Sequence, residues 1–584
     1  MTTFEVWAPS AGRVRVRIKG AGHEAADHEL AAGEEGWWRA EVPEAGPGDD
    51  YGYLLGDSTQ PLPDPRSLRQ PDGVHGLSRL YDHSAYPWTD TAWTGRQLPG
   101  SILYELHVGT FTPEGTFDAA IEKLPHLVSL GVDMVELLPV NAVNGTHNWG
   151  YDGVLWYAVH EPYGGPDGMK RFVDACHRIG LGVVVDVVYN HLGPSGAYMP
   201  QFGPYLTEGR NTWGQSFNLD GPGSDEVRKH MIDNALMWLR DFHVDGLRLD
   251  AVHALVDRRA VHVLEELRRE TEVLSTHLGR PLSLIAESDL NDARLVTAWE
   301  AGGYGLHGVW DDDVHHAVHA LITGERQGYY GDYGSMDSLT TVLTSAYLHA
   351  GTWSSFRQRV HGRPVDRTNI PGHRFVASLQ NHDQIGNRAT GDRLSATLPP
   401  TLLKVGAALI LTSPFTPMLF MGEEWGASTP WQFFTSHPEP ELGEATATGR
   451  KAEFAEHGWD AAEVPDPQDP ATFANSKLDW SELDGDPHKE ILAFYRELVA
   501  VRKAHPDLSD PRLDEVRVAH SEADHWLVIR RGSLAVAVNL AGERQSVPLD
   551  RAPQEVLLAS ERWVVLSSHE VEMPAQSVAI LDLG

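Results

Sequence analysis

The hydrophobic positions of this chain follow two rhythms, and the rhythm changes near residue 100. Up to residue 95, short runs alternate apolar and polar side chains. In FEVWAPSAGRVRVRIKG, for example, Val14, Val16 and Ile18 share one face, while basic residues occupy the other. Alternation of this kind, interrupted by turns rich in glycine and proline, is typical of half-buried antiparallel strands. We therefore expect residues 1–95 to form an N-terminal β-sandwich.

From residue 96 to 506 the pattern changes to nearly continuous apolar runs of strand length, separated by amphipathic helical stretches. Parallel strands covered by helices are apolar on both faces, so this rhythm indicates a parallel sheet. Eight such runs favour a closed (β/α)8 TIM barrel over an open sheet. The amphipathic stretch 490–503 fits its last helix. The expected strands span residues 102–108, 134–140, 182–190, 246–251, 282–288, 308–313, 375–383 and 417–424.

Short alternating runs return in the last part of the chain and predict a C-terminal β-domain over residues 507–584. The polar segment 437–454 is expected to be a loop at the barrel rim or the surface. The expected fold class is therefore multidomain α/β, with a central TIM barrel between two β-rich domains.

Charge and cysteine content narrow the range of functions. The 82 acidic residues exceed the 47 basic ones and give a formal charge of −35. Because phosphates would be repelled, we expect neither nucleic acid nor membrane as a partner. A single cysteine, Cys176, excludes an internal disulfide. The N-terminus MTTFEVWAPS lacks signal-peptide character, and no apolar run is long enough to span a bilayer, so a cytoplasmic location is expected.

Three acidic motifs in the barrel region carry the candidate chemistry. They are GLRLDAVH around Asp250, LIAESD around Glu287 and SLQNHDQIGNR around Asp383. Each follows an apolar strand, so each carboxylate would lie at the C-terminal rim of the barrel, where the active sites of this fold are built. Paired carboxylates at one rim can cleave a glycosidic bond by double displacement. We therefore predict a retaining glycosidase site.

The residues suggest distinct roles for the first two carboxylates. Asp250 is the candidate nucleophile, because a carboxylate can attack the anomeric carbon. Arg248, two residues earlier on the same strand face, could keep it ionised, although an Arg–Asp pair alone is more often structural. Glu287 follows the apolar strand LSLIA, where burial raises a carboxyl pKa and suits a general acid and base.

Four motifs resemble the sequence signatures of the α-amylase superfamily of retaining glycosidases. They are DVVYNH (186–191), GLRLDAVH (246–253), AESD (286–289) and NHD (381–383). The resemblance implies that Asp383 is a third carboxylate that grips sugar hydroxyls. It also implies a set of substrate-binding neighbours, in which the tyrosine stacks on the sugar or is simply a buried aromatic. This set comprises Tyr151, Asn190, His191, Arg248 and His382. Asp186, together with Asn190, is expected to orient the rim through hydrogen bonds.

Longer strings resemble one branch of that superfamily, the maltooligosyltrehalose trehalohydrolases. These strings cover residues 147–166, 186–198, 284–292 and 309–325. The N-terminal FEVWAP also resembles the carbohydrate module that precedes the barrel in trehalohydrolases and in 1,4-α-glucan branching enzymes, which are the nearest alternative. The likeness implies cleavage of the α-1,4 bond next to a terminal trehalose, and functional coupling to a synthase that makes the substrate.

Other chemistries are less well supported. The residues Asp311, Asp312 and Asp313 could bind a metal or a polyol, but a solvated loop is an equal alternative. The thirty histidines lack zinc-site spacing, and no EF-hand string or phosphate loop is present, so no metal or cofactor is expected. A glucan-binding scaffold without catalysis would have no need of all three carboxylates.

Overall fold

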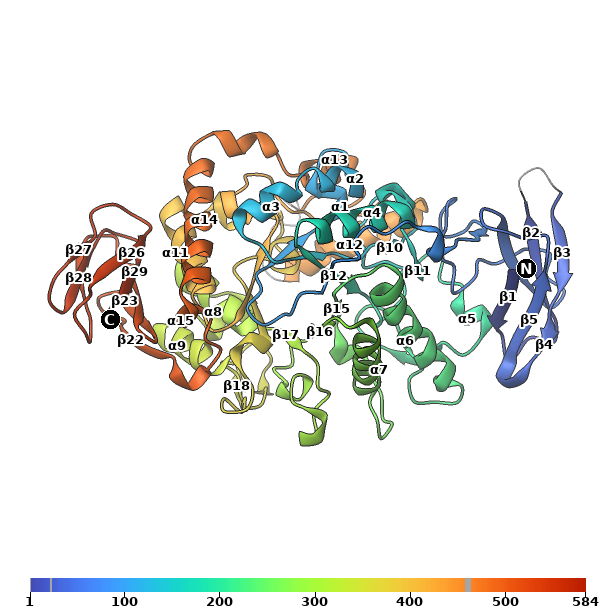
Figure 1. The fold of residues 1–584 in the computed structure, drawn as a ribbon, viewed down its shortest axis with the longest axis horizontal. Helices are drawn as coiled ribbons and strands as arrows, with labels where there is room; N and C mark the ends of the chain where they lie inside the picture. The colour runs from blue at the N-terminus through green and yellow to red at the C-terminus, as the bar shows by residue number, and fades with distance from the viewer. Residues whose placement is uncertain (1, 21–23, 457–463) are drawn as a thin grey trace.

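The computed structural model describes residues 2–20, 24–456 and 464–584. The molecule is elongated, with an N-terminal β-region at one end, a barrel in the middle and a C-terminal β-region at the other end (Figure 1). Among the helices in the described ranges, none combines the length and hydropathy needed to cross a membrane.

The N-terminal region contains two small sheets, with strand orders β1-β5-β4 and β3-β2-β6-β7. Val14, Val16 and Ile18 of β2 are buried, as the alternation predicted, because their shared face meets the core between the sheets. The strands are β1 (Thr2–Trp7), β2 (Val14–Lys19), β3 (Ala26–Glu29), β4 (Ala31–Ala32), β5 (Trp37–Val42), β6 (Asp50–Leu55) and β7 (Ser78–Arg79).

The central region is a closed barrel of parallel strands in the order β12-β15-β16-β17-β20-β21-β8-β9. All eight predicted runs contribute a strand, which confirms the TIM barrel. The first strand, β8, pairs with the last, β21, and this pairing closes the barrel. The strands are β8 (Leu103–Leu106), β9 (Met134–Leu137), β12 (Gly182–Val187), β15 (Gly246–Leu249), β16 (Ser283–Ala286), β17 (Gly308–Trp310), β20 (Phe375–Ser378) and β21 (Thr416–Phe420).

Helices cover the barrel, and their buried apolar side chains belong to the same hydrophobic core as those of the strands. Cys176 is buried on the inner side of α4. The predicted last helix is α14, which packs beside α11. The main helices are α2 (Phe117–Ile121), α3 (Leu124–Leu130), α4 (Gly165–Arg178), α6 (Ser224–Asp241), α7 (Val263–Leu278), α8 (Asp312–Thr323), α9 (Met336–Ser345), α11 (Pro400–Leu411) and α14 (His488–Ala504).

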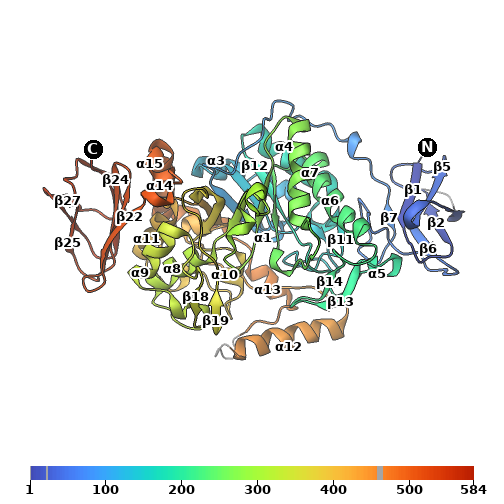
Figure 2. The same ribbon diagram turned by 90° about the horizontal axis from the view of Figure 1, so that it is seen from below.

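The segment 437–454 corrects one sequence prediction, because most of it is helical rather than a loop. Helix α12 (Pro440–Glu456) extends along one edge of the barrel region (Figure 2). The segment carries Glu, Leu, Ala and Lys, which are strong helix formers. Its apolar residues do not gather on one face, so periodicity gave no helical signal.

The C-terminal region contains a five-stranded sheet, β22-β23-β24-β29-β26, and a three-stranded sheet, β25-β28-β27. Lys404 on α11 links the C-terminal region to the barrel. Its ammonium contacts Glu561 beyond β26 in the C-terminal region and Glu490 of α14 in the barrel region. The strands are β22 (Arg517–Ser521), β23 (Trp526–Arg531), β24 (Leu534–Asn539), β25 (Gln545–Pro548), β26 (Glu555–Ala559), β27 (Val565–Leu566), β28 (Glu570–Met573) and β29 (Ser577–Asp582).

Candidate active site

Neighbouring barrel strands deliver the two main carboxylates to the same rim. Asp250 follows β15 and Glu287 follows β16, and these strands pair in register with Leu249 opposite Ala286. Asp383 follows β20 on the short helix α10 (His382–Gly386). The side chains of Asp250, Glu287 and Asp383 are 13%, 15% and 41% exposed, so the first two are sheltered and the third faces outward.

A fully buried guanidinium, that of Arg248, lies at the centre of the site. Its Nη1 donates to Asp250 Oδ1 at 2.6 Å and to Asp186 Oδ2 at 2.8 Å. Its Nη2 lies 3.7 Å from Glu287 Oε2, and its plane lies over the Trp310 ring at 4.3 Å. One permanent cation therefore contacts three carboxylates, and the predicted pairing of Arg248 with Asp250 is one of these contacts.

The environment of Glu287 favours its protonated form. Burial raises its pKa to about 8, and the negative charges of Asp250 and Asp383 act in the same direction against the opposing Arg248. The backbone N–H of Ala251 donates to Glu287 Oε2 at 2.7 Å. Ala251, directly after Asp250, has a left-handed backbone conformation with φ of 40°. Its hydrogen bond to Glu287 links the Asp250 motif to the Glu287 motif.

Tyr151 and His382 form one wall of the site. The Tyr151 hydroxyl donates to Asp186 Oδ2 at 2.6 Å and lies 2.8 Å from His382 Nε2. The two rings stack with centroids 5.1 Å apart and an interplanar angle of 20°. Tyr151 and His382 thus link the hydrogen-bonded cluster around Arg248 to the motif of Asp383. The Oδ2 atom of Asp383 lies 3.4 Å from His382 Nε2.

His191 and Asn190 lie beside that wall. His191 Nε2 contacts the backbone oxygen of Tyr151 at 2.9 Å. Within the described ranges, His191 Nδ1 and both polar atoms of the buried Asn190 side chain make no hydrogen bond. The backbone oxygen of Asn190 accepts from Asn211 at 2.9 Å. The neighbouring hairpin β13–β14 (Leu206–Arg210 and Gln215–Phe217) carries Trp213, whose ring stacks toward His191 at 6.1 Å.

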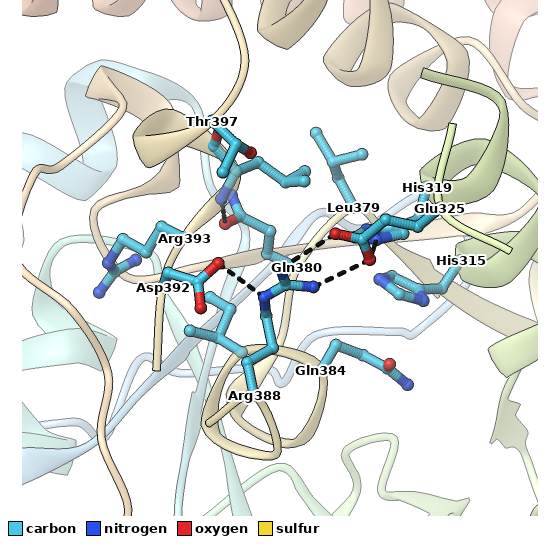
Figure 3. Close-up of a pocket in the computed structure, with 12 residues that line it drawn as sticks. His315, His319, Glu325, Leu379, Gln380, Gln384, Arg388, Asp392, Arg393 and Thr397 are labelled. Atoms are coloured by element: carbon cyan, nitrogen blue, oxygen red, sulfur yellow. Dashed lines mark hydrogen bonds and ion pairs between the residues drawn. The ribbon is translucent and has the colours of Figure 1, made fainter. Parts of the chain in front are cut away.

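The segment directly after α10 is anchored by Arg388. Its guanidinium contacts both carboxylate oxygens of Glu325 at 3.0 Å and Asp392 at 2.8 Å (Figure 3). The side chain of Gln380 accepts from the backbone of Leu394 at 3.1 Å. Only a small cavity of about 10 Å³ remains among these groups. Such packing gives α10 a defined position relative to the ends of β15 and β16, which carry Asp250 and Glu287.

Sequence reasoning missed Glu105, which is buried against His382. Its Oε1 lies 2.6 Å from His382 Nδ1, and its Oε2 accepts from the backbone N–H of His382 at 3.0 Å. Glu105 belongs to β8, far from all four motifs in the sequence. The available signal was an acidic residue inside the apolar run ILYELHV, because buried carboxylates need a partner.

Two of the three aspartates after β17, Asp311 and Asp313, have structural roles, and the run begins helix α8 rather than a solvated loop. Asp311 caps α8, and the buried Asp313 accepts hydrogen bonds from Tyr333 and Asn291. Asp312 is half-buried, and burial raises its pKa to about 7, assisted by the charge of Asp383. Across residues 2–20, 24–456 and 464–584, no group of three or more metal-binding side chains is placed to hold a metal ion.

Three family models match parts of the chain. Residues 1–65 match carbohydrate-binding module 48, the isoamylase N-terminal domain. Residues 75–205 match the alpha amylase catalytic domain, and residues 511–580 match a domain of unknown function, DUF3459. These matches fall on the N-terminal sheets, the first three strands of the barrel and the C-terminal sheets.

A curated relative matches almost from end to end. The malto-oligosyltrehalose trehalohydrolase of Arthrobacter ramosus is 61% identical over 548 residues, which cover 93% of this chain and 94% of the relative. The chain belongs to the malto-oligosyltrehalose trehalohydrolase family. In this chain an α-amylase-type barrel lies between a module-48 domain and a C-terminal β-domain.

Two further proteins are similar to this chain over most of its length, one in structure and one in sequence. A crystal structure from Salmonella typhimurium, whose description assigns it provisionally to the alpha amylases, superposes with a TM-score of 0.89 at 37% identity and covers 99% of this chain and 97% of that one. The 1,4-alpha-glucan branching enzyme of Bacillus caldolyticus is 26% identical over 609 residues, which cover 95% of this chain and 80% of that enzyme. The branching-enzyme alternative is thus the more distant likeness.

Proposed function

We propose that this protein hydrolyses the α-1,4-glucosidic bond next to the terminal trehalose of maltooligosyltrehalose and releases trehalose, with retention of anomeric configuration. The observation that carries the chemistry is the convergence of Asp250 and Glu287 on Arg248 at the carboxyl ends of neighbouring strands. The full-length similarity to trehalohydrolases supports the choice of substrate.

In the proposed first step, an oxygen of Asp250 attacks the anomeric carbon of the sugar on the non-reducing side of the bond. The bond to the trehalose oxygen breaks as Glu287 transfers its proton to that oxygen. Arg248 holds the carboxylate of Asp250 in place by a hydrogen bond, and burial favours the protonated form of Glu287. Trehalose leaves as a neutral alcohol, and a glycosyl ester remains on Asp250.

In the second step, Glu287 is ionised and accepts a proton from water as the water attacks the same carbon. The ester bond to Asp250 breaks, and a maltooligosaccharide leaves. The Ala251 N–H at 2.7 Å from Glu287 supports this carboxylate form during the step. We assign Asp383, with Tyr151, Asn190, His191 and His382, to hold the reacting sugar.

Retention is a testable consequence of this mechanism. We expect the carboxyl groups of Asp250 and Glu287 to lie roughly 5–5.5 Å apart, since a water molecule need not fit between nucleophile and sugar. Proton NMR of the first product formed should then show the α-anomer before mutarotation. Initial release of the β-anomer would indicate direct attack by water and contradict the nucleophilic role of Asp250.

Substrate choice is tested with maltotriosyltrehalose and maltopentaose under matched conditions. We expect cleavage to trehalose and maltotriose to exceed maltopentaose cleavage by about 100-fold or more in kcat/KM. The α,α-1,1 linkage turns the last ring away from its position in maltose, and polar groups that fit one ring are left unpaired by the other. Product chromatography provides the measurement.

Two results of that comparison would contradict the proposal. Equal cleavage of the two oligosaccharides would remove the trehalose preference. New α-1,6 branches on amylose would instead favour the branching-enzyme alternative, in which a sugar hydroxyl replaces water in the second step.

We further propose the division of the chain into residues 1–95, 96–506 and 507–584, a cytoplasmic location and functional coupling to a maltooligosyltrehalose synthase. The changes in strand type near residues 95 and 507 support the domain division. A synthase that isomerises the reducing end of a maltooligosaccharide would supply the substrate.

A further inference from the structure

Glu105 makes a two-point contact with His382 that reaches from the first barrel strand to the motif after the seventh. One carboxylate oxygen faces ring Nδ1 at 2.6 Å, and the other accepts the backbone N–H at 3.0 Å. Both side chains are almost fully buried, with 2% and 1% exposure. Because one carboxylate accepts both hydrogen bonds, it fixes the position of the first residue of α10 and the rotation of the His382 ring.

The hydrogen bonds on the other side of the ring determine its protonation. The Tyr151 hydroxyl has one proton, and the bond of 2.6 Å to Asp186 Oδ2 uses it. The hydroxyl oxygen therefore accepts at its 2.8 Å contact with His382 Nε2, which must carry a proton. Nδ1 faces a carboxylate oxygen and carries one too. An imidazole with two protonated nitrogens is a cation.

We propose that Glu105 is a positioning residue of the glycosidase site, which keeps His382 as a fixed cation beside Tyr151 and Asp383, where the sugar is bound. This inference rests on the proposed function only for the identity of the sugar. The cation would donate its Nε2 proton to the cluster, or to a sugar hydroxyl that displaces Tyr151 as its acceptor. Glu105 itself touches neither the sugar nor the reacting bond.

The charged groups around His382 together favour its protonated, cationic form. Burial lowers its pKa, but the carboxylates of Asp383 and Glu105 outweigh burial and raise it to about 9. Arg248 opposes them from β15. The charged and titratable groups that face the ring from all surrounding elements are Glu105, Glu136, His107, Tyr151, Asp186, Arg248 and Asp383.

The experiment is the pH profile of kcat/KM for Glu105→Gln, which keeps the shape of the side chain and removes its charge. Without that charge the pKa of His382 falls, so the imidazole becomes neutral at a lower pH. We expect the fall of kcat/KM on the alkaline side of its pH profile, the alkaline limb, to move to lower pH. At pH 8 the loss should reach about 10- to 100-fold, the value of a charged hydrogen bond, and it should shrink toward pH 6.

A matched control is Glu136→Gln. Glu136 lies directly opposite Glu105 in the β8–β9 register and is equally buried, but no hydrogen bond joins it to His382. Burial and the charge of Glu105 raise the pKa of Glu136 well above its usual range, which favours the neutral form that glutamine resembles. We expect its pH profile to match the parent. Glu105→Asp, which restores the charge at shorter reach, should recover part of the loss.

A second readout is independent of any substrate. The short Nδ1–H bond to a carboxylate should give a far-downfield proton NMR resonance. This resonance should be present in the parent and in Glu136→Gln, and absent in Glu105→Gln and His382→Gln. If Glu105→Gln fails to fold, the same comparison uses Glu105→Asp, for which we expect a shifted resonance and a small displacement of the alkaline limb.

Several results would overturn the inference. A pH-independent loss in Glu105→Gln would indicate that the residue only packs, as would persistence of the downfield resonance. An equal limb shift in Glu136→Gln would show that any buried carboxyl has the same effect. If the parent cleaves maltopentaose but not maltotriosyltrehalose, the proposed substrate fails, while the Glu105 profile can still be measured with maltopentaose.

Discussion

Replacement of Asp250 by alanine should reduce kcat on maltooligosyltrehalose by on the order of 10⁴-fold or more, because no glycosyl ester can form without the attacking oxygen. The protein should remain folded. Arg248 keeps its 2.8 Å bond to Asp186, and the loss of one negative charge relieves repulsion within the cluster. We expect the unfolding free energy to change by less than about 2 kcal/mol.

Single-turnover kinetics and chemical denaturation would measure both effects. Asp118→Ala is a matched control, since it removes an aspartate that is paired with an arginine, Arg171, but lies on helix α2 rather than at the site. It should keep parental kcat. If Asp250→Ala retained more than a few per cent of parental turnover, another group would have to be the nucleophile.

Glu287→Gln should lower kcat by on the order of 10³-fold or more, since an amide can neither donate the proton to the leaving oxygen nor accept one from water. The KM should change little, because shape and burial are preserved. In the parent, Glu287 is protonated below its raised pKa of about 8 and becomes ionised above it. Parental kcat/KM should therefore fall as pH rises through about 8. The residual activity of the variant should lose this fall and keep only the later one set by His382, whose pKa is about 9.

The leaving group provides a control for the acid role. A nitrophenyl leaving group departs without a proton, so formation of the glycosyl ester by Glu287→Gln should be much less impaired with a nitrophenyl maltooligoside than with a sugar leaving group. A burst of nitrophenol would report that step. An equal loss with both leaving groups would contradict the assignment of Glu287 as general acid.

Much of this architecture could be predicted because local patterns agree with the tertiary structure. The eight apolar runs are strands because both of their faces are covered, which removes the polar alternation and leaves a strong signal. The strand-end placement of Asp250 and Glu287 followed from the same runs. The Arg248–Asp250 pair followed from the period of a strand, which puts alternate residues on one face.

Other features could not be predicted because they depend on distant pairings. Helix α12 has no apolar stripe, so only its composition of helix formers marks it. The partner of His382 is Glu105, and nothing local in either motif indicates the other, since 277 residues separate them. Likewise the sequence around Asp313 was compatible with a solvated loop, whereas the folded chain brings Tyr333 and Asn291 to its carboxylate.

The pairing of β8 with β21 has a consequence for biosynthesis. Met418 pairs with Leu103, so the ring of strands cannot close until more than four hundred residues have been translated. A nascent chain that already contains Asp250 and Glu287 still exposes two unpaired strand edges, which can associate with other chains. Folding of this protein should therefore depend on holdase chaperones until the β21 segment leaves the ribosome, and catalytic competence should appear late and abruptly rather than grow with chain length.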